Sequence, residues 1–164
     1  MSCTFLLRAT ADMDVTIIGA GVAGLCCAVE LAERGVDVEV IERSEHLGAN
    51  SCSWYAGGML APWCELETAE PLVAQLGVES IEWWGRHFSG LVRNGSLVIA
   101  HGRDRAELAH FARRTQHYQA LNRSDIGELE PDLAGRFEQA LFFADEAHLD
   151  PRAALAALAQ RLED

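Results

Sequence analysis

The chain has 164 residues, a net charge of −12 and a hydrophobic fraction of 49%. This length is enough for one domain with a hydrophobic core and short for two complete domains. An acidic surface repels phosphate polymers, so the charge argues against nucleic-acid binding, although a helix N-terminus can still bind an anionic cofactor locally. No apolar run reaches the roughly 18 residues of a membrane span, which predicts a soluble protein.

The N-terminal stretch, residues 1–11, lacks the features of a secretory signal. Its apolar run is short, and Arg8 follows this run instead of preceding it. We therefore expect a frayed leader here, with Met13 as an alternative start of the protein.

The cysteines indicate a reducing environment. Their number, five, is odd, and no C-x-x-C pair occurs, which argues against a disulfide framework and against a zinc site. Cys26 and Cys27 are adjacent in a helical pattern and are predicted to be small buried residues. This cysteine usage predicts a cytoplasmic protein.

The first part of the chain predicts a βαβ unit. Residues 14–19, with the sequence DVTIIG, form a β-branched run that ends in glycine, as buried strands do. Residues 22–34 carry apolar side chains at helical spacing, and Gly35 follows where a C-cap glycine belongs. Residues 37–42, DVEVIE, predict a second strand, which should lie parallel to the first with a right-handed crossover.

Short elements are predicted to follow a polar loop over residues 43–53. Ser53 is predicted to cap a short helix of small residues, which Pro62 would end. A longer helical pattern covers residues 68–88, with Gly77 as a potential interruption.

Residues 96–100 read as a strand. Asp104 and Glu107 have the spacing of a capping box, which predicts a helix reaching about Arg114.

The last third predicts two further helices and one strand. Ser124 or Asp125 is expected to open a short helix, and residues 140–144 to form a strand. Asp150, which precedes a proline, is a strong helix start, and residues 153–162 form the predicted helix.

The main chemical motif is a glycine fingerprint, Gly19-Ala20-Gly21-Val22-Ala23-Gly24. By itself this pattern is weak, but here a strand precedes it, a helix follows it, and Glu42 ends the next strand. Gly19 allows a tight turn, Gly21 lets the backbone approach a pyrophosphate, and Gly24 lets the helix pack close to the strand. Amide groups at the helix start would hold the phosphates, and Glu42 would accept hydrogen bonds from ribose hydroxyls.

The fingerprint suits NAD and FAD alike, whereas a 2′-phosphate of NADP would meet the negative charge of Glu42. Arg43 is either a surface residue or a contact to the adenosine part of the cofactor. A second motif, residues 53–62, is rich in small residues, which would let a flat ring system lie against the backbone. From composition alone a tightly packed buried helix is the favoured interpretation of this segment.

Together, DVTIIGAGVAGLCCAVELAERGVDVEVIER and SWYAGGMLAP resemble FAD-dependent oxidases of the D-amino-acid oxidase and sarcosine oxidase superfamily. Within that superfamily the sequence is most similar to the glycine oxidases of thiamine biosynthesis. The later segments GSLVIAHGRDRAELAHFARR and LEPDLAGRFEQALFFADEAHLDPRAALAAL extend the resemblance over almost the whole chain from Asp14 onward.

The resemblance implies an α/β fold: a Rossmann-like FAD-binding domain followed by the beginning of an α+β substrate domain. Its boundaries are predicted as residues 13–66 for the FAD-binding βαβ and flavin-contact segment, 67–147 for the partial substrate domain, and 148–164 for a helix returning to the FAD domain.

The cofactor-binding residues that the fingerprint and the resemblance imply are Gly19, Ala20, Gly21, Val22, Ala23, Gly24, Glu42, Arg43, Ser53, Ala56, Gly57, Gly58 and Met59. Tyr55 and Gly57 stand where the family often has alanines, which leaves the direction of Tyr55 open. His148 is predicted to be structural, and no metal site is expected.

The resemblance further implies that the full-length protein oxidises glycine or a similar small amine to the imine, with FAD as hydride acceptor and O2 forming hydrogen peroxide. The substrate-binding tyrosine and arginines of the family match no residue here, so we expect an N-terminal fragment without a catalytic residue. Other hypotheses are a non-catalytic nucleotide-binding module, an NAD enzyme, and a sarcosine oxidase or D-amino-acid dehydrogenase. Oligomeric state stays open, with a homo-oligomer as one outcome.

Overall fold

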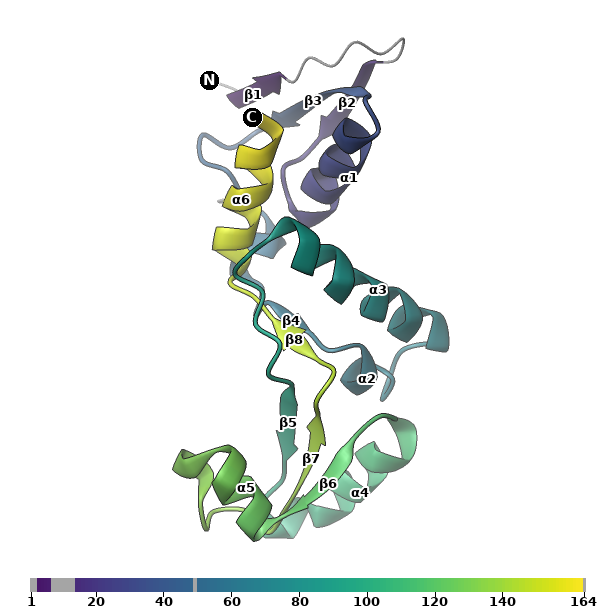
Figure 1. The fold of residues 1–164 in the computed structure, drawn as a ribbon, viewed down its shortest axis with the longest axis vertical. Helices are drawn as coiled ribbons and strands as arrows, with labels where there is room; N and C mark the ends of the chain where they lie inside the picture. Colours follow the sequence, from purple (N-terminus) through teal and green to yellow (C-terminus); the bar gives the residue numbers. More distant parts are fainter. Residues whose placement is uncertain (1–2, 7–13, 49, 164) are drawn as a thin grey trace. The chain divides into compact units, whose positions relative to one another are not determined.

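The computed structural model describes residues 3–6, 14–48 and 50–163, and the chain forms two compact units (Figure 1). The first unit comprises Met1–Gly58, His87–Gly90 and Leu149–Asp164, and the second comprises Met59–Arg86 and Leu91–His148. In the described part of the chain, no helix combines the length and the apolar character needed to cross a membrane.

The first unit contains the predicted βαβ arrangement. Strand β2 (Asp14–Ile18), helix α1 (Val22–Glu33) and strand β3 (Asp37–Glu42) follow one another, and β2 pairs with β3 in parallel. The prediction of two parallel strands joined by a helix is therefore confirmed. The sheet order is β1-β3-β2, which leaves β2 at one edge.

Strand β1 (Cys3–Leu6) pairs antiparallel with β3, from Cys3 opposite Glu42 to Leu6 opposite Glu39. The expectation of a frayed leader is wrong for these four residues, whereas Met13 lies outside the described residues. The physical reason is that β3 has a second edge of backbone N–H and C=O groups, which a short apolar segment can pair with.

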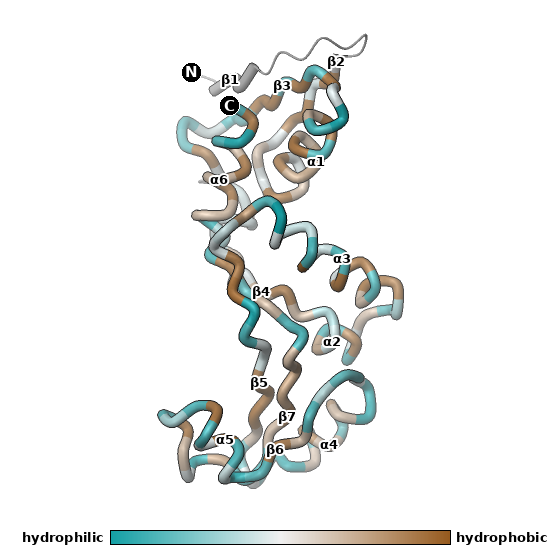
Figure 2. Tube along the Cα trace, in the orientation of Figure 1, coloured by the Kyte–Doolittle hydropathy of each residue, from teal (hydrophilic) through white to brown (hydrophobic). Residues whose placement is uncertain are grey.

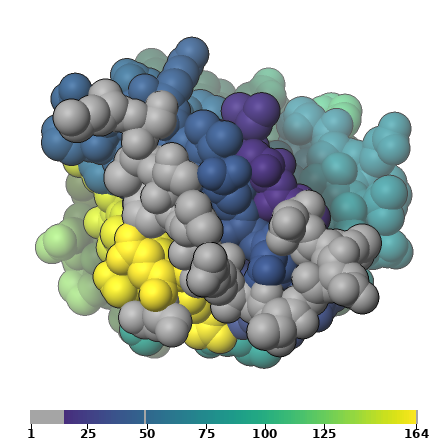
Figure 3. All heavy atoms as spheres, turned by 90° about the horizontal axis from the view of Figure 1, so that it is seen from above, coloured from purple at the N-terminus to yellow at the C-terminus, as the bar shows by residue number. Residues whose placement is uncertain are grey.

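Helices α1 and α6 (Pro151–Glu163) pack against each other beside this sheet, and in Figure 3 α6 is the yellow segment. Helix α6 begins as predicted, because Asp150 Oδ1 accepts hydrogen bonds from the N–H groups of Arg152 and Ala153, at 2.8 and 3.1 Å. The buried apolar residues of the two helices are Leu25, Ala28, Val29, Ala154, Leu155, Leu158, Ala159 and Leu162.

The two adjacent cysteines of α1 differ in environment. Cys26 is half-buried, and burial is the main cause that raises the pKa of its thiol to about 11. Cys27 is exposed, so the prediction that both are buried is wrong for Cys27. Consecutive residues of a helix point about 100° apart, so one packed face cannot hold both side chains.

The segment after β3 differs most from expectation. It forms a 3₁₀ turn η1 (Cys52–Tyr55), a short strand β4 (Met59–Leu60) and helix α2 (Pro62–Glu65). The prediction of a helix that runs from Ser53 and ends at Pro62 is wrong, because Pro62 begins a helix. Proline lacks the N–H that a first helical residue leaves unused, and this makes it a good first residue.

The second unit is built on an antiparallel sheet of strands β5 (Ser96–Ile99), β7 (Gln139–Phe143) and β6 (Gln119–Asn122), in that order. Figure 2 shows the hydrophobic residues along β5 and β7. The predicted strands at 96–100 and 140–144 are confirmed. Strand β6 was not predicted, since its sequence QALN buries only Leu121 and has no apolar alternation.

This part of the chain also contains three further helices. Helix α3 (Pro71–His87) runs through Gly77 without interruption, and a Cβ at Gly77 would lie 2.8 Å from Cβ of Pro62. Helices α4 (Arg105–Arg114) and α5 (Arg123–Leu129) lie where the sequence predicted helices.

The caps of α4 and α5 differ from those predicted. Asp104 makes no side-chain cap hydrogen bond, and the short 3₁₀ turn η2 (Gly102–Asp104) leads into α4 instead. Helix α5 is capped by Asn122, whose side chain accepts from the N–H of Asp125 while the Asp125 carboxylate accepts from the N–H of Asn122. Asparagine is as good an N-cap as serine or aspartate, so Asn122 can cap the helix in place of the predicted Ser124 or Asp125.

Candidate dinucleotide-binding site

The turn between β2 and α1 has the backbone conformation that the fingerprint requires. Gly19 has φ +105°, which residues with a side chain rarely adopt, and its N–H donates to the carbonyl of Ile41 at 2.8 Å. Helix α1 then begins at Val22, with Gly21 as its N-cap residue.

Gly24 packs against this turn without any space for a side chain. A Cβ at Gly24 would lie 1.9 Å from the carbonyl oxygen of Gly19 and 3.4 Å from Cγ2 of Ile17. A Cβ at Gly21 would meet Oγ of Ser53 at 3.4 Å, which is ordinary contact. The close approach of helix to turn therefore depends on Gly24.

Glu42 is buried at the end of β3 and fixes the turn through its carboxylate. Its Oε2 accepts from the N–H of Ala20, and its Oε1 accepts from the N–H of Ser44, both at 2.9 Å. The N–H of Ala20 is the main cause that lowers the pKa of Glu42, followed by that of Ser44. The ribose contact stays a prediction, and the sequence analysis missed the contact with the turn, although an acid at the end of a parallel strand lies at the same sheet edge as the turn.

Ser53 joins the second motif to the first. Its Oγ accepts a hydrogen bond from the N–H of Val22 at 3.0 Å, across 31 positions of sequence. Ser53 therefore satisfies a free donor at the start of α1 instead of capping a helix of its own. Ser51 is the cap residue of η1, with its side chain accepting from the N–H of Trp54.

A cavity of about 330 Å³ lies at this edge of the first unit. It is lined by Ile18, Gly19, Gly21, Ile41, Glu42, Arg43, Asn50 and Ser51. Of the two interpretations of Arg43, its place on the cavity wall favours the ligand contact. Asn50 and Ser51 were not predicted as site residues, and Asn50 is held by a hydrogen bond from its Nδ2 to Oγ of Ser44 at 2.9 Å.

The remaining fingerprint residues build the turn without lining the cavity. Ala20 is fully buried, while Val22 and Ala23 are exposed on the first turn of α1. Such a wall of turn amides, a carboxylate and an arginine is suited to an anionic nucleotide.

The second motif has two glycines with different surroundings. A Cβ at Gly57 would meet no atom within 4 Å, so the backbone there has open space on that side. Gly58 has φ +72°, and its Cβ would lie 2.0 Å from the carbonyl oxygen of Leu149, whose N–H donates to Gly58 at 3.0 Å. The close approach of Leu149 therefore explains why a glycine is needed at position 58. The open space at Gly57 is compatible with the expected packing of a flat ring against the backbone. Tyr55 and Met59 are both largely exposed, at 71% and 63%.

These surroundings predict effects of very different size for alanine at the two glycines. Gly58→Ala is expected to lower the free energy of unfolding by about 2–4 kcal/mol, because it combines a backbone clash with an unfavourable φ. Gly57→Ala should change it by less than about 0.5 kcal/mol. Urea denaturation of both variants measures the difference, and equal destabilisation would contradict the assignment.

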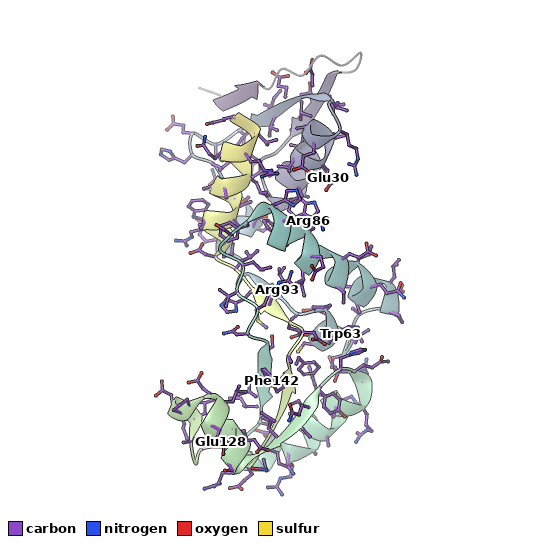
Figure 4. All side chains as sticks on the ribbon, in the orientation of Figure 1. Glu30, Trp63, Arg86, Arg93, Glu128 and Phe142 are labelled. Carbon is purple, nitrogen blue, oxygen red and sulfur yellow. The ribbon has the colours of Figure 1, made fainter. Side chains whose placement is uncertain are left out.

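One further cluster lies in the first unit. Glu30, Glu33 and His87 each place a potential metal ligand atom within 4.8 Å of the others, and Glu30 is labelled in Figure 4. Arginines already neutralise both carboxylates, with Arg34 Nη2 2.7 Å from Glu30 and Arg161 Nη2 2.7 Å from Glu33. The hydrogen bond from Arg161 is the main cause that lowers the pKa of Glu33. We interpret the cluster as an ion-pair network between helices.

Comparison with known proteins agrees with this geometry. Residues 14–164 match the protein family described as FAD dependent oxidoreductase. The chain is 54% identical over 153 residues to a putative thiamine biosynthesis oxidoreductase ThiO of Rhizobium etli, covering 93% of this chain and 46% of that protein. It is 30% identical to a D-amino acid dehydrogenase of Paramagnetospirillum magneticum, over 77% of this chain and 32% of that protein.

Solved structures give the same result. Glycine oxidase from Geobacillus kaustophilus has a TM-score of 0.70 at 28% identity, over 89% of this chain and 43% of that one. Glycine oxidase from Bacillus cereus shares the fold, with a TM-score of 0.73 at 24% identity, over 91% and 43% of the two chains. The chain thus spans less than half the length of these relatives.

The family match covers every residue from the start of β2 onward, including both motifs, and the relatives confirm the resemblance and the α/β fold inferred from sequence. The chain belongs to the FAD-dependent oxidoreductase family.

Proposed function

We propose that this chain supplies the nucleotide-binding part of the FAD site in an oxidase that acts on glycine or a similar small amine. The observation that carries the proposal is the turn at Gly19, where α1 begins beside the buried carboxylate of Glu42 and under the hydroxyl of Ser53. The relationship to the ThiO-type protein and to glycine oxidase supports the substrate class.

The residues present fit the phosphates and ribose of FAD. The first N–H groups of a helix have no intrahelical partner, and the N–H of Val22 is the one that Ser53 occupies. Those of Ala23 and Gly24 are suited to a phosphate oxygen, and the hydroxyl of Ser53 keeps its own hydrogen to donate. The ionised carboxylate of Glu42 has further lone pairs for ribose hydroxyls.

The open side of Gly57 would accommodate a planar ring against the backbone. FAD supplies the hydride-accepting chemistry when bound, and the protein supplies binding, orientation and electrostatics. The residues that hold the substrate carboxylate are proposed to lie outside these 164 residues, as the resemblance implies. The free thiols of Cys26, Cys27, Cys52 and Cys64 support the cytoplasm as the proposed location.

The proposal is tested by absorbance spectra of the full-length protein, first as purified and then after anaerobic addition of glycine, sarcosine or D-alanine. A flavin spectrum that bleaches with an amine is the expected result, followed by hydrogen peroxide formation when air is admitted. A colourless protein would refute the FAD assignment. Bleaching without peroxide formation would instead favour a dehydrogenase, the activity named for one of the relatives.

A further inference from the structure

Glu146 is a fully buried carboxylate in the second unit, in the turn between β7 and strand β8 (Ala147–His148). Its Oε1 accepts from the N–H of Trp63 at 3.0 Å and from the N–H of Cys64 at 2.8 Å, more than 80 positions earlier in the chain. Figure 4 labels Trp63. Burying a carboxylate is costly unless hydrogen bonds stabilise it, and these two N–H groups provide such hydrogen bonds for Oε1.

The two donors are the first free N–H groups of α2, because Pro62 at the start of this helix has none. Glu146 therefore caps α2 from a distant part of the sequence. The thiol of Cys64 also hydrogen-bonds Glu146, and its pKa is raised, mainly by burial and then by the charge of Glu146. Cys64 thus stays a protonated donor.

The residues after Glu146 hold the same segment through their backbone. Strand β8 pairs antiparallel with β4, Met59 opposite His148 and Leu60 opposite Ala147. Two residues are too few for a strand pair to be stable by itself. The β8 backbone and the Glu146 side chain therefore act together on the stretch from Met59 to Cys64, one at each end.

We propose that Glu146 is a positioning residue of the FAD site. By fixing the start of α2 it holds β4, and with it Met59, the last residue of the predicted flavin-contact segment. Loss of this cap frees the stretch from Met59 to Cys64, which weakens FAD binding and changes the surroundings of the flavin ring. The inference rests on the proposed FAD site and adds a residue that makes no contact with the cofactor itself.

The test uses the full-length protein and three substitutions of Glu146. Glu146→Gln keeps one oxygen to accept both N–H groups, Glu146→Asp withdraws the acceptor by one methylene, and Glu146→Ala removes it. The matched control is Asp145→Ala, which removes the adjacent and exposed carboxylate. FAD dissociation constants, circular dichroism in the visible flavin bands and the unfolding temperature of the apoprotein are measured for each variant.

Glu146→Ala is expected to raise the FAD dissociation constant about tenfold or more and to change the flavin dichroism, because two partly buried donors lose their acceptor. Glu146→Asp should show the same effects more weakly. If the alanine variant does not fold, the aspartate variant tests the proposal in its place. Glu146→Gln should restore both properties to near those of the parent protein, and Asp145→Ala should leave them unchanged.

Lower unfolding temperatures with unchanged FAD affinity and dichroism would show a purely structural cap and overturn the proposal. A folded Glu146→Gln variant as impaired as the alanine variant would also overturn it. A parent protein that binds no FAD would instead contradict the proposed function, so the two failures are distinguishable.

Discussion

Gly24→Ala is expected to abolish FAD binding and to destabilise the first unit. The new methyl carbon would lie 1.9 Å from the carbonyl oxygen of Gly19, a backbone atom inside the proposed phosphate-binding turn. Overpacking of this kind costs about 1–3 kcal/mol and occasionally more, and here the helix can relieve it only by moving away from the turn. Flavin content after purification and urea denaturation measure the two effects.

The matched control is Gly102→Ala, since a Cβ at Gly102 would meet no atom within 4 Å. This variant should retain the flavin content and unfolding midpoint of the parent protein. A Gly24→Ala protein with normal flavin content would show that helix α1 does not need this close contact.

Glu42→Gln is expected to weaken FAD binding and to lower the free energy of unfolding by about 1–3 kcal/mol. The two carboxylate oxygens accept from the N–H groups of Ala20 and Ser44, and an amide offers one oxygen and one NH2 group in their place. One buried donor therefore faces another donor. Fluorescence titration with FAD and urea denaturation are the measurements, with the exposed Glu45→Gln as control.

The pH dependence of stability should change with the same substitution. Because the folded-state pKa of Glu42 is lowered, its contribution is present above its unfolded pKa of about 4.3 and is lost as pH falls through the lower folded value. The stability difference between the parent protein and Glu42→Gln should therefore shrink at acid pH. A difference that stays constant over this range would contradict the role assigned to the ionised carboxylate.

Local sequence patterns were sufficient for the βαβ unit, because its pairing connects consecutive elements and its glycines act on their neighbours. They were also sufficient for α6, since Asp150 caps residues that follow it directly. The same reasoning failed for residues 53–62, where small residues suit a tight helix and an irregular chain equally. Gly58 adopts a left-handed conformation against Leu149, a residue 91 positions later, which no local pattern contains.

Side-chain contacts also divide into those that local geometry fixes and those that depend on residues far apart in the sequence. The position of Glu42 beside the fingerprint turn could be predicted because the βαβ geometry fixes it. The bonds from Val22 to Ser53 and from Cys64 to Glu146 join residues 31 and 82 positions apart, so only tertiary structure reveals them. Strands β1 and β6 likewise form by pairing with the edge of another strand, β3 and β7 respectively, and their own amino-acid composition gives little indication of a strand.

The position of β2 at the edge of its sheet has a practical consequence for handling the 164-residue chain. Its outer backbone groups have no strand partner among the described residues, and Ile18 at its end is 87% exposed. An open, apolar strand edge is a template on which another copy can add, leading to sheet-mediated self-association. Preparations of this chain alone should therefore be checked by light scattering before any binding measurement is interpreted.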